Sequence, residues 1–503
     1  MAEQSNANRP ARPPQRSIAE VASQLPGGHV HGDAVVTGLS ISGSSTVPGD
    51  LFVAARGART HGARHAPEAL AAGAVAVLTD EEGAALLDPG TPHVVMPASP
   101  RTVLGPLSAW FYDHPAEAMT TVGITGTQGK TTTTYLVAAA LADRHTGVIG
   151  SIGTRIDGVP IPSSLTTPEA PQLHALLALM RERGVRTVAA EVSSHSLVQG
   201  RVDGLRFDVG IFLNLGHDHL DFHGDQASYL EAKRELLLPA HSAHGLVCVD
   251  SSVGRRLAAD PGLDARSFSI ANSGADWFAE AIREDAAGTT FTVRGPDGAR
   301  QEFRTPLRGD FHTTDILAAV AALAESGHPL PELAEAIAGY PGVEGRMQFL
   351  DLDPELKVVV DAGHKPEAIN ALLVALRPMT DGRVITVMGS NGNRDAHKRR
   401  LMGRLTAMAS DILVVTDDDP EHEDPAEIRR VVIDGTRSTE AEVLEEGDRA
   451  RAIRLAVSLC RPGDVLAVVG KGNNHYQLLA EGWTYFNDEE QIAAALREHP
   501  LRA

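Results

Sequence analysis

Residues 120–141, TTVGITGTQGKTTTTYLVAAAL, constrain the fold of this chain more than any other segment. β-Branched residues come first, a glycine-rich stretch follows, and helix-forming residues complete the segment. This order predicts a strand over 122–125, a turn over 126–129 and a helix from about Lys130. The glycines let backbone N–H groups surround a phosphate, and the start of the helix adds partial positive charge. The chain is therefore expected to contain an α/β domain that binds a mononucleotide.

The predicted nucleotide contacts lie in this loop. We expect Lys130 to reach the β- and γ-phosphates and the Thr131 hydroxyl to bind Mg²⁺. The predicted phosphate-binding set also contains Gly126, Thr127, Gly129 and Thr132. The common pattern G-x-x-x-x-G-K fails at one position, because Ile124 occupies the place of the first glycine. The loop is therefore a variant of the phosphate-binding loop.

Lysine is rare in this chain, with six lysines against 39 arginines. Five of the six lie in short segments whose residue types suggest a binding or catalytic role. They are Lys130, Lys233, Lys365, Lys398 and Lys471. Unlike arginine, lysine is a compact charge that can lose its proton and react. Chance, together with a compositional preference for arginine, is the alternative explanation for any single one of them.

Length and composition set broad limits on the protein. A chain of 503 residues predicts two to four domains. The formal net charge of -20 argues against nucleic acid as the main partner. Cys248 and Cys460 lie in apolar runs and form no metal or disulfide framework, and no run of 18 apolar residues predicts a membrane span. We therefore expect a monomeric cytoplasmic protein whose partners are small molecules, neither nucleic acid nor membrane.

The order of the predicted elements indicates an α/β chain of three domains. Residues 1–16 read as a disordered tail, and residues 17–117 as a small α/β domain. Residues 118–343 alternate strands and helices in the pattern of a doubly wound parallel sheet. Residues 344–503 do so again, as in a Rossmann-like domain. Ligands bind such sheets at the carboxyl ends of the strands, which is where the polar motifs fall.

Two of these strand ends carry acids and histidines. AEVSSHSLVQGR follows one predicted strand and starts with Glu191 at its end. FLNLGHDHLDFHG follows the next and presents Asn214, His217, Asp218, His219, Asp221 and His223. Any one of these histidines is more often structural than a ligand. Together, beside a phosphate loop, they are explained by a second divalent ion near the triphosphate, although Mg²⁺ prefers oxygen ligands to imidazole.

In order and spacing, the motifs of residues 35–490 resemble those of the Mur ligases. They are TGTQGKTT, TTPE, EVSSHSL, NLGHDHLDFHG, EAK, GRM, DAGHKP, GSNGNRDAHKRRLM, TDDDPEHEDP and GKGNNHYQ. Within that family they are most similar to the ligases that add the third amino acid to UDP-N-acetylmuramoyl-L-Ala-D-Glu. The resemblance implies that ATP phosphorylates a donor carboxylate and that an amino-acid amine attacks the acyl phosphate, with catalysis mostly by positioning and charge neutralisation.

The resemblance also implies roles for individual residues. Thr131 and Glu191 would hold one Mg²⁺, and His219 and a carbamylated Lys233 a second. With Lys130, the residues Glu191, His219 and Lys233 form the implied catalytic set. Asp315, Arg346, Asp361 and His364 would complete the ATP site, although Arg346 and Asp361 could instead form an ion pair at a domain interface.

Two further sets follow from the same resemblance. The donor side would comprise Ser42, Ser44, Thr166, Thr167, Ser193, His195, Gln199 and Arg201. The amino-acid side would comprise Arg394, Asp418, Asp419, Glu421, Gly470 and Asn474.

The residues expected to select the donor and those expected to select the amino acid both depart from the family pattern. Ser42-Gly43-Ser44 replaces a uridine-binding Asp-Ser-Arg, and His61 replaces an Asp. Family members selective for meso-diaminopimelate carry Asp-Asn-Pro-Arg. The arginine of this motif binds the carboxylate at the far end of that amino acid. Here the segment is Asp418-Asp419-Pro420-Glu421, and Asn474 stands where a family Glu meets the far ammonium.

These departures leave three interpretations open. The chain is a peptidoglycan ligase with an unusual amino acid, a ligase that has moved to another pathway such as a peptide-like natural product, or a nucleotide-binding partner without activity. The intact Lys130, Thr131, Glu191, His219 and Lys233 argue against the third interpretation.

Overall fold

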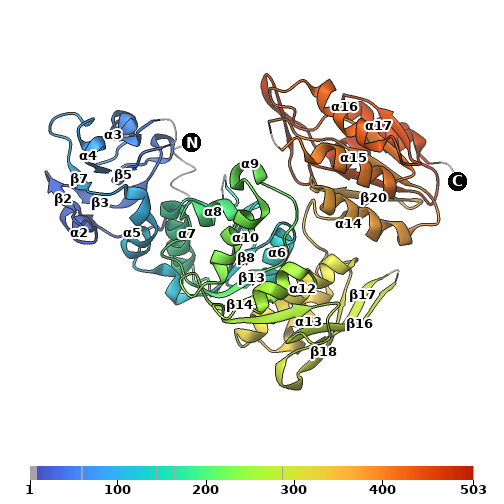
Figure 1. Ribbon diagram of the computed structural model, residues 1–503, viewed down its shortest axis with the longest axis horizontal. Helices are drawn as coiled ribbons and strands as arrows, with labels where there is room; N and C mark the ends of the chain where they lie inside the picture. Colours follow the sequence, from blue (N-terminus) through green and yellow to red (C-terminus); the bar gives the residue numbers. More distant parts are fainter. Residues whose placement is uncertain are drawn as a thin grey trace.

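The computed structural model describes residues 8–57, 60–142, 144–161, 165–285, 287–393 and 395–501. Three sheets form three successive blocks of the chain, and the first and last blocks lie on opposite sides of the central one (Figure 1). The three sheets fall within the three predicted domain ranges, while the exact boundaries stay predictions. The α/β fold class is confirmed.

The N-terminal block is a five-stranded sheet in the order β2 (His29–His31), β7 (His93–Met96), β6 (Ala76–Asp80), β5 (Asp50–Ala54) and β4 (Gly38–Ser40). Strands β4 to β7 are parallel, and β2 is antiparallel at one edge. A small pair, β1 (Arg16–Ser17) and β3 (Val35–Val36), lies beside it. The helices of this block are α2 (Ile18–Ser23), α3 (Ala66–Ala71), α4 (Glu81–Ala84) and α5 (Leu104–Phe111).

The predicted disordered tail is wrong for residues 8–16. The Arg9 guanidinium bonds to the buried Asp50, with Nη2 2.8 Å from Oδ2. The backbone N–H of Ala11 donates to Glu182 at 2.7 Å. A buried carboxylate needs a counter-charge, and Arg9 supplies it from a segment whose composition looks disordered. Residues 1–7 lie outside the described residues.

The central block is an 11-stranded sheet. The order is β11 (Val159–Ile161), β10 (Gly153–Ile156), β9 (Thr146–Gly150), β12 (Thr187–Glu191), β8 (Thr120–Thr125), β13 (Phe207–Phe212), β14 (Ser242–Cys248), β15 (Ala265–Ser269), β16 (Trp277–Asp285), β17 (Gly288–Arg294) and β18 (Arg300–Thr305). From β9 to β16 neighbours are parallel, and antiparallel strands extend both edges. This is the predicted parallel sheet.

Helices cover both faces of this sheet, because buried side chains alternate along its strands. They are α6 (Lys130–Ala140), α7 (Ala170–Glu182), α8 (Ser194–Val198), α9 (Leu220–His223), α10 (Gln226–Arg234), α11 (Ser252–Ala258), α12 (Asp310–Glu325) and α13 (Leu330–Ala338). Ala189 of β12 belongs to the core cluster that includes side chains of α6, α12 and α13, whereas Val188 and Ala190 belong to the cluster that includes α7. The phosphate loop leaves β8 between β12 and β13, with Glu191 paired to Ile124 and Phe212 to Thr125. Three strand ends therefore meet at one place.

The C-terminal block is a six-stranded sheet in the order β19 (Gln348–Asp353), β20 (Leu356–Asp361), β24 (Val465–Val469), β21 (Val384–Met388), β22 (Ile412–Val415) and β23 (Glu442–Glu445). All but β19 are parallel, as in the predicted Rossmann-like domain. Its helices are α14 (Pro366–Leu376), α15 (Lys398–Ala409), α16 (Pro425–Thr436), α17 (Arg449–Leu459) and α18 (Asp488–Glu498), and a hairpin joins β25 (Tyr476–Leu479) to β26 (Gly482–Tyr485).

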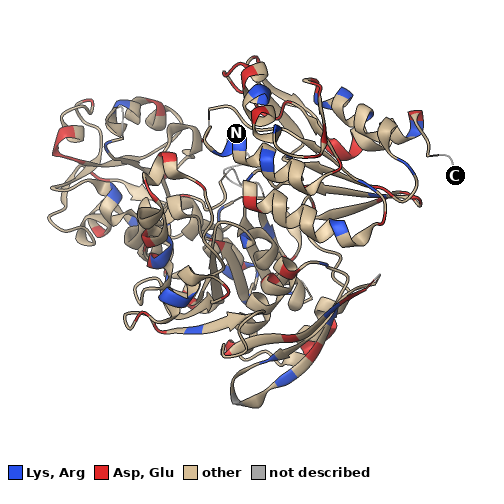
Figure 2. Cartoon of the chain, turned by 45° about the vertical axis from the view of Figure 1, so that its right-hand side comes forward, with Lys and Arg blue, Asp and Glu red and all other residues tan. Residues whose placement is uncertain are grey.

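Charges of both signs are interspersed along the chain in Figure 2. On the C-terminal block they form local pairs, for example Arg400 with Asp434 and Arg429 with Glu445. Across the described residues, every helix is too short or too polar to cross a bilayer.

Candidate active site

A cavity of about 520 Å³ lies between the central and C-terminal sheets. Residues from the phosphate loop, from the ends of β12 and β13, and from the segment after β20 line it. Fifteen of the residues predicted from sequence meet there: Gly126, Thr127, Gly129, Lys130, Thr131, Thr132, Thr166, Glu191, Ser193, His219, Lys233, Asp315, Arg346, Asp361 and His364. The cavity therefore joins the predicted phosphate, metal and ATP-facing residues in one place.

Asn214, just past β13, fixes the shape of the phosphate loop. Its Oδ1 accepts hydrogen bonds from the N–H groups of Thr127 at 3.0 Å and Gln128 at 2.9 Å. The Lys130 ammonium donates to the carbonyls of Gly126 at 2.8 Å and Thr127 at 3.2 Å. Burial, and then the charge of Lys365, lower the pKa of Lys130 to about 8. A phosphate near Lys130 would favour its charged form.

Thr131 and Glu191, the residues predicted to hold the first Mg²⁺, lie in one group with Ser151. The Thr131 hydroxyl lies 2.9 Å from the Ser151 hydroxyl, which lies 3.1 Å from Glu191 Oε1. The Ser151 N–H also donates to Glu191 Oε1, at 2.8 Å. Glu191 is 1% exposed, so its carboxylate is held in place. Two hydroxyls and a carboxylate beside a phosphate loop fit Mg²⁺, which prefers oxygen ligands.

Lys233 lies directly beneath the phosphate loop. It is 1% exposed, and its Nζ donates to the Gly126 carbonyl at 2.8 Å. Burial, and then the charges of Lys130 and Lys365, hold its pKa well below the ordinary range for lysine. The amine is thus pushed towards its neutral, nucleophilic form.

His219 and Asp218 also line the cavity beside the phosphate loop. His219 Nε2 is 3.0 Å from Asp218 Oδ2, and the His219 ring lies edge-on to that of His195, with centroids 4.7 Å apart. Burial lowers the pKa of His219, so the ring is neutral and can offer a lone pair to a metal ion. Among the described residues, no three His, Cys, Asp or Glu side chains form a ready metal cluster.

Lys365 connects the C-terminal block to this site. Its Nζ lies 2.7 Å from Asp218 Oδ2 and donates to the Thr127 carbonyl at 2.9 Å. Nearby, Asp361 accepts from the N–H groups of Met347 at 2.7 Å and Gly363 at 2.6 Å. Asp361 thereby holds the turn that carries Arg346 towards the cavity.

We expect Lys365→Met to weaken binding of Mg²⁺-ADP about tenfold or more, because charge-assisted hydrogen bonds contribute roughly 1.5 to 3 kcal/mol. Isothermal titration calorimetry measures the effect. Lys357→Met is the matched control, because Lys357 bonds to the Met379 carbonyl and does not line the cavity. Equal binding of Mg²⁺-ADP by the two variants would contradict a role of Lys365 in nucleotide binding.

Asp315 and His312 lie at the far end of the cavity, on the first turns of α12. A Cβ added to Gly129 would lie 2.4 Å from Asp315 Oδ1, so glycine is required where α12 meets the loop. Gly129 also has a φ of +84°. Burial raises the pKa of Asp315 and lowers that of His312 to about 4. Burial therefore favours the neutral form of both side chains beside the phosphate loop.

The predicted donor residues form a neighbouring cluster. The Thr167 hydroxyl donates to the Glu191 carbonyl at 2.8 Å and accepts from the Ser193 N–H at 3.2 Å. Arg201 donates to Gln199 Oε1 and pairs with Glu169, in both cases with Nε at 2.9 Å. Ser42 and Ser44 lie apart, on the N-terminal block, with their hydroxyls 2.8 Å from each other.

The predicted amino-acid residues form a third cluster, at the carboxyl ends of β22 and β24. The Lys471 Nζ lies 3.2 Å from Asp418 and 2.8 Å from Asp419. Glu421, at a φ of +54°, accepts from Asn393 Nδ2 at 3.2 Å. The other predicted members, Gly470 and Asn474, belong to the loop after β24, and Arg394 lies outside the described residues.

Sequence reasoning did not single out Ser151 or Tyr229, and it named Asn214 and Lys365 without predicting the contacts that they make here. Ser151 directly follows β9, so the rule that ligands bind at strand ends, which points to Asn214 after β13, applies to Ser151 as well. Tyr229 lies on α10, where its hydroxyl is 3.2 Å from the Thr127 hydroxyl. The EAK motif predicts that this helix reaches the site through Lys233, but no sequence signal points to Tyr229 itself.

Three family models match the chain, described as Mur ligase family, catalytic domain (residues 35–109), Mur ligase middle domain (124–323) and Mur ligase, glutamate ligase domain (345–472). A relative from Streptomyces coelicolor, named UDP-N-acetylmuramoyl-L-alanyl-D-glutamate–2,6-diaminopimelate ligase, is 41% identical over 97% of this chain and 98% of its own. A Leifsonia xyli protein named UDP-N-acetylmuramyl-tripeptide synthetase is 40% identical, with 98% of both chains covered. A solved structure titled as a diaminopimelate ligase of the same name covers 92% of this chain and 95% of its own, with a TM-score of 0.63 and 27% identity.

Proposed function

Because the chain belongs to the Mur ligase family, we propose that it adds an amino acid to UDP-N-acetylmuramoyl-L-Ala-D-Glu in peptidoglycan precursor synthesis. As a family member it is an ATP-dependent, ADP-forming ligase that uses Mg²⁺ and small-molecule substrates. The observation that carries the proposal is the match of almost the whole chain to a relative named for this reaction. We also propose that it acts in the cytoplasm as a monomer.

The first step transfers the γ-phosphoryl group of ATP to an oxygen of the donor carboxylate, which gives an acyl phosphate and ADP. Lys130 neutralises charge on the β- and γ-phosphates, and Arg346 meets them from the C-terminal domain. Asp315, Asp361 and His364 hold the rest of the nucleotide. In the second step the amino-acid amine attacks the acyl carbon, a C–N bond forms, phosphate leaves, and the amine proton passes to solvent.

Two Mg²⁺ ions, when bound, would neutralise charge on the triphosphate and on the acyl phosphate oxygens. Thr131 and Glu191 are the proposed residues for the first ion, and His219 and Lys233 for the second. Lys233 would bind through a carbamate: its nitrogen attacks CO₂, an N–C bond forms, and one proton is released. The buried, weakly basic amine of Lys233 supports this proposal.

The remaining proposed residues position the two substrates. Thr166, Thr167, Ser193, His195, Gln199 and Arg201 would hold the donor peptide, with Ser42 and Ser44 at its uridine end. Arg394, Asp418, Asp419, Glu421, Gly470 and Asn474 would hold the amino acid.

A second interpretation keeps the reaction and changes the donor. Ser42 and Ser44 bond to each other at 2.8 Å and offer no charge to a uridine diphosphate. This observation favours a ligase of another pathway, with a carboxylate donor that lacks UDP.

The deciding experiment supplies the purified protein with ATP, Mg²⁺, UDP-N-acetylmuramoyl-L-Ala-D-Glu and single amino acids. ADP release is followed by a coupled assay, and the tripeptide product by mass spectrometry. L-Ala-D-Glu without the UDP-sugar is the control donor. We expect product with the UDP-linked donor alone. Equal rates with the free dipeptide would favour the second interpretation, and no ADP release with any donor would contradict ligase activity.

We predict that meso-diaminopimelate is not the preferred amino acid. Glu421 stands where a carboxylate-binding arginine is found in diaminopimelate-selective enzymes, so it would face the far carboxylate of that substrate with a like charge. The loss amounts to roughly 1 to 3 kcal/mol, or about ten- to a hundredfold in kcat/KM relative to lysine or ornithine. Steady-state kinetics with diaminopimelate, lysine, ornithine and neutral amino acids measure it.

The control for this prediction is a matched charge reversal. Glu421→Arg should raise kcat/KM for meso-diaminopimelate, whereas Glu498→Arg, at the exposed end of α18, should not. The prediction is wrong if diaminopimelate already gives the highest kcat/KM with the unmodified protein.

A further inference from the structure

A buried ion pair lies behind the proposed amino-acid site. Arg449 begins α17 and Asp488 begins α18, and both side chains are 0% exposed. The contact is bidentate, with Nε 2.8 Å from Oδ1 and Nη2 2.8 Å from Oδ2. A guanidinium with two parallel bonds to a carboxylate is held in one orientation.

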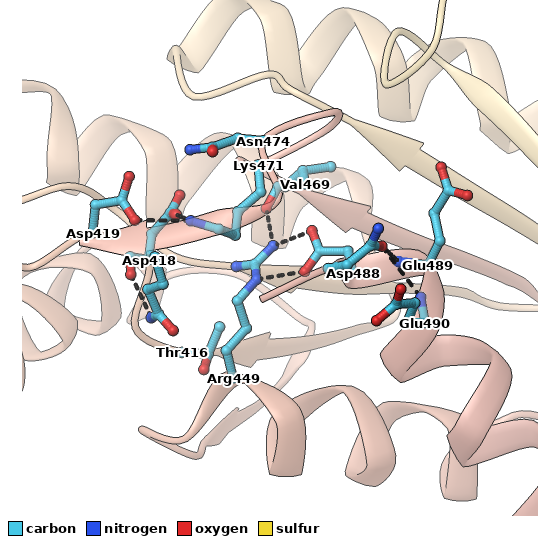
Figure 3. Close-up of polar contacts among 12 residues, drawn as sticks. Thr416, Asp418, Asp419, Arg449, Val469, Lys471, Asn474, Asp488, Glu489 and Glu490 are labelled. Atoms are coloured by element: carbon cyan, nitrogen blue, oxygen red, sulfur yellow. Dashed lines mark hydrogen bonds and ion pairs between the residues drawn. The ribbon is translucent and has the colours of Figure 1, made fainter. Parts of the chain in front are cut away.

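This pair is connected to the loop that carries Lys471. Arg449 Nη2 also donates to the carbonyl of Val469, the last residue of β24, at 3.0 Å. Gly470 follows, and Lys471 then turns back to bond to Asp418 and Asp419. Figure 3 shows the Arg449 guanidinium between Asp488 on one side and Asp418 on the other. The pair therefore fixes the strand end from which the amino-acid loop departs.

The charges of the Lys471 cluster also act on Arg449. Burial alone would lower the pKa of Arg449, but the charge of Asp488, and then those of Asp418 and Asp419, outweigh it and raise that pKa. Three carboxylates face two cations in this buried cluster, Asp418, Asp419 and Asp488 against Lys471 and Arg449. Removal of Arg449 alone would leave these three carboxylates with Lys471 as the one cation of the cluster and draw Lys471 towards them.

The loop is tightly packed around this arrangement. A Cβ on Gly470 would lie 2.5 Å from Asp418 Oδ2, and the Gly470 N–H donates to the Asp361 carbonyl at 2.9 Å. Leu478 of the hairpin donates its N–H to Asp419 Oδ1 at 3.0 Å. A shift of the end of β24 would therefore move Asp418, Lys471 and the hairpin together.

We propose that Arg449, held by Asp488, is a positioning residue for the acceptor amino acid, which it orients through the end of β24 and the Asp418–Asp419–Lys471 cluster. The inference rests on the proposed function. It predicts a selective defect: the step that uses the amino acid suffers, and the step that forms the acyl phosphate does not.

The test compares three variants of the full chain. Arg449→Met/Asp488→Leu removes both charges, so that neither is left buried alone, which is the more damaging change. Arg449→Lys keeps the charge but cannot span both oxygens of Asp488. Arg383→Met is the matched control: Arg383 Nη2 pairs with Asp464 at 2.6 Å and donates to the Leu459 carbonyl at 2.6 Å, at the opposite end of β24.

Two reactions are measured with UDP-N-acetylmuramoyl-L-Ala-D-Glu as donor. One traps the acyl phosphate with hydroxylamine in the absence of amino acid. The other is complete ligation with L-lysine, L-ornithine or meso-diaminopimelate. For the double variant we expect an amino-acid KM raised about tenfold or more, with trapping and the ATP KM within about threefold of the unmodified protein. Arg449→Lys should give a smaller rise, and Arg383→Met should lower thermal stability without raising the amino-acid KM.

The outcomes separate the two proposals. An unchanged amino-acid KM in a folded variant, or an equal fall in trapping and ligation, overturns the positioning role. If the double variant does not fold, the amino-acid KM of Arg449→Lys decides. Failure of the unmodified protein to form the hydroxamate would instead contradict the proposed donor.

Discussion

Lys130→Ala is expected to lower the ligase rate by about 10²-fold or more. The ammonium lies at the start of α6 and is held by two loop carbonyls, at 2.8 Å and 3.2 Å, where it faces the cavity. Its loss removes the charge that would neutralise the transferring phosphoryl group, and no other lysine occupies the loop. ADP release in the complete reaction measures the effect.

The controls for this prediction separate charge from folding. Lys357→Ala removes a lysine of the C-terminal block that does not line the cavity, and its rate should be unchanged. Circular dichroism and thermal denaturation should show that Lys130→Ala is folded, because half-buried Lys130 supports no core packing. A folded Lys130→Ala enzyme with a near-normal rate would refute the nucleotide assignment.

The phosphate loop shows how much of the fold could be predicted from sequence. The strand, turn and helix around Gly126 and Lys130 are local, since periodicity and glycine placement specify them within 22 residues. Strand-end motifs such as Glu191 could be assigned to one edge of the sheet because parallel strands end on the same side. The α/β class follows from the same patterns.

Long-range contacts could not be read in this way. Lys365 stands 238 positions from Thr127, yet it bonds to the Thr127 carbonyl. The Arg449–Asp488 pair spans 39 positions and joins the starts of two helices. Composition predicts a disordered tail around Arg9, because composition alone does not reveal the buried Asp50 that holds this residue. Each of these contacts depends on how whole elements pack, which periodicity within one element does not specify.

The proposed amino-acid site shows a different limit of prediction from sequence. Glu421 and Asn474 could be recognised as departures from the family pattern, and the structure gives Glu421 a partner in Asn393. The amino acid itself depends on free-energy differences of a few kcal/mol in the pocket, which neither residue types nor distances supply. Kinetics with Glu421→Arg test how the pocket selects the side chain of the amino acid. Kinetics with the Arg449 variants test how the loop after β24 positions that amino acid.

Lys233→Ala is expected to lower the ligation rate by about 10²-fold or more, as does the removal of other electrostatic groups from active sites. The Lys233 amine lies 2.8 Å from the Gly126 carbonyl in a site where burial and two neighbouring lysines hold its pKa low. A neutral amine there can react with CO₂, and the resulting carboxylate would supply the oxygen ligands that Mg²⁺ prefers. Alanine removes both the amine and its carbamate.

Chemical rescue distinguishes a carbamate from a structural amine. Acetate or formate should restore part of the Lys233→Ala activity, because a small carboxylate can enter the space left by the side chain. Lys233→Arg keeps a cation, fills that space and cannot form a lysine carbamate, so it should be inactive and not rescued. Carbon-13 NMR of the unmodified protein in labelled bicarbonate reports the carbamate without reference to activity. Absence of that signal in an enzyme that is turning over, or equal rescue of both variants, would contradict carbamylation of Lys233.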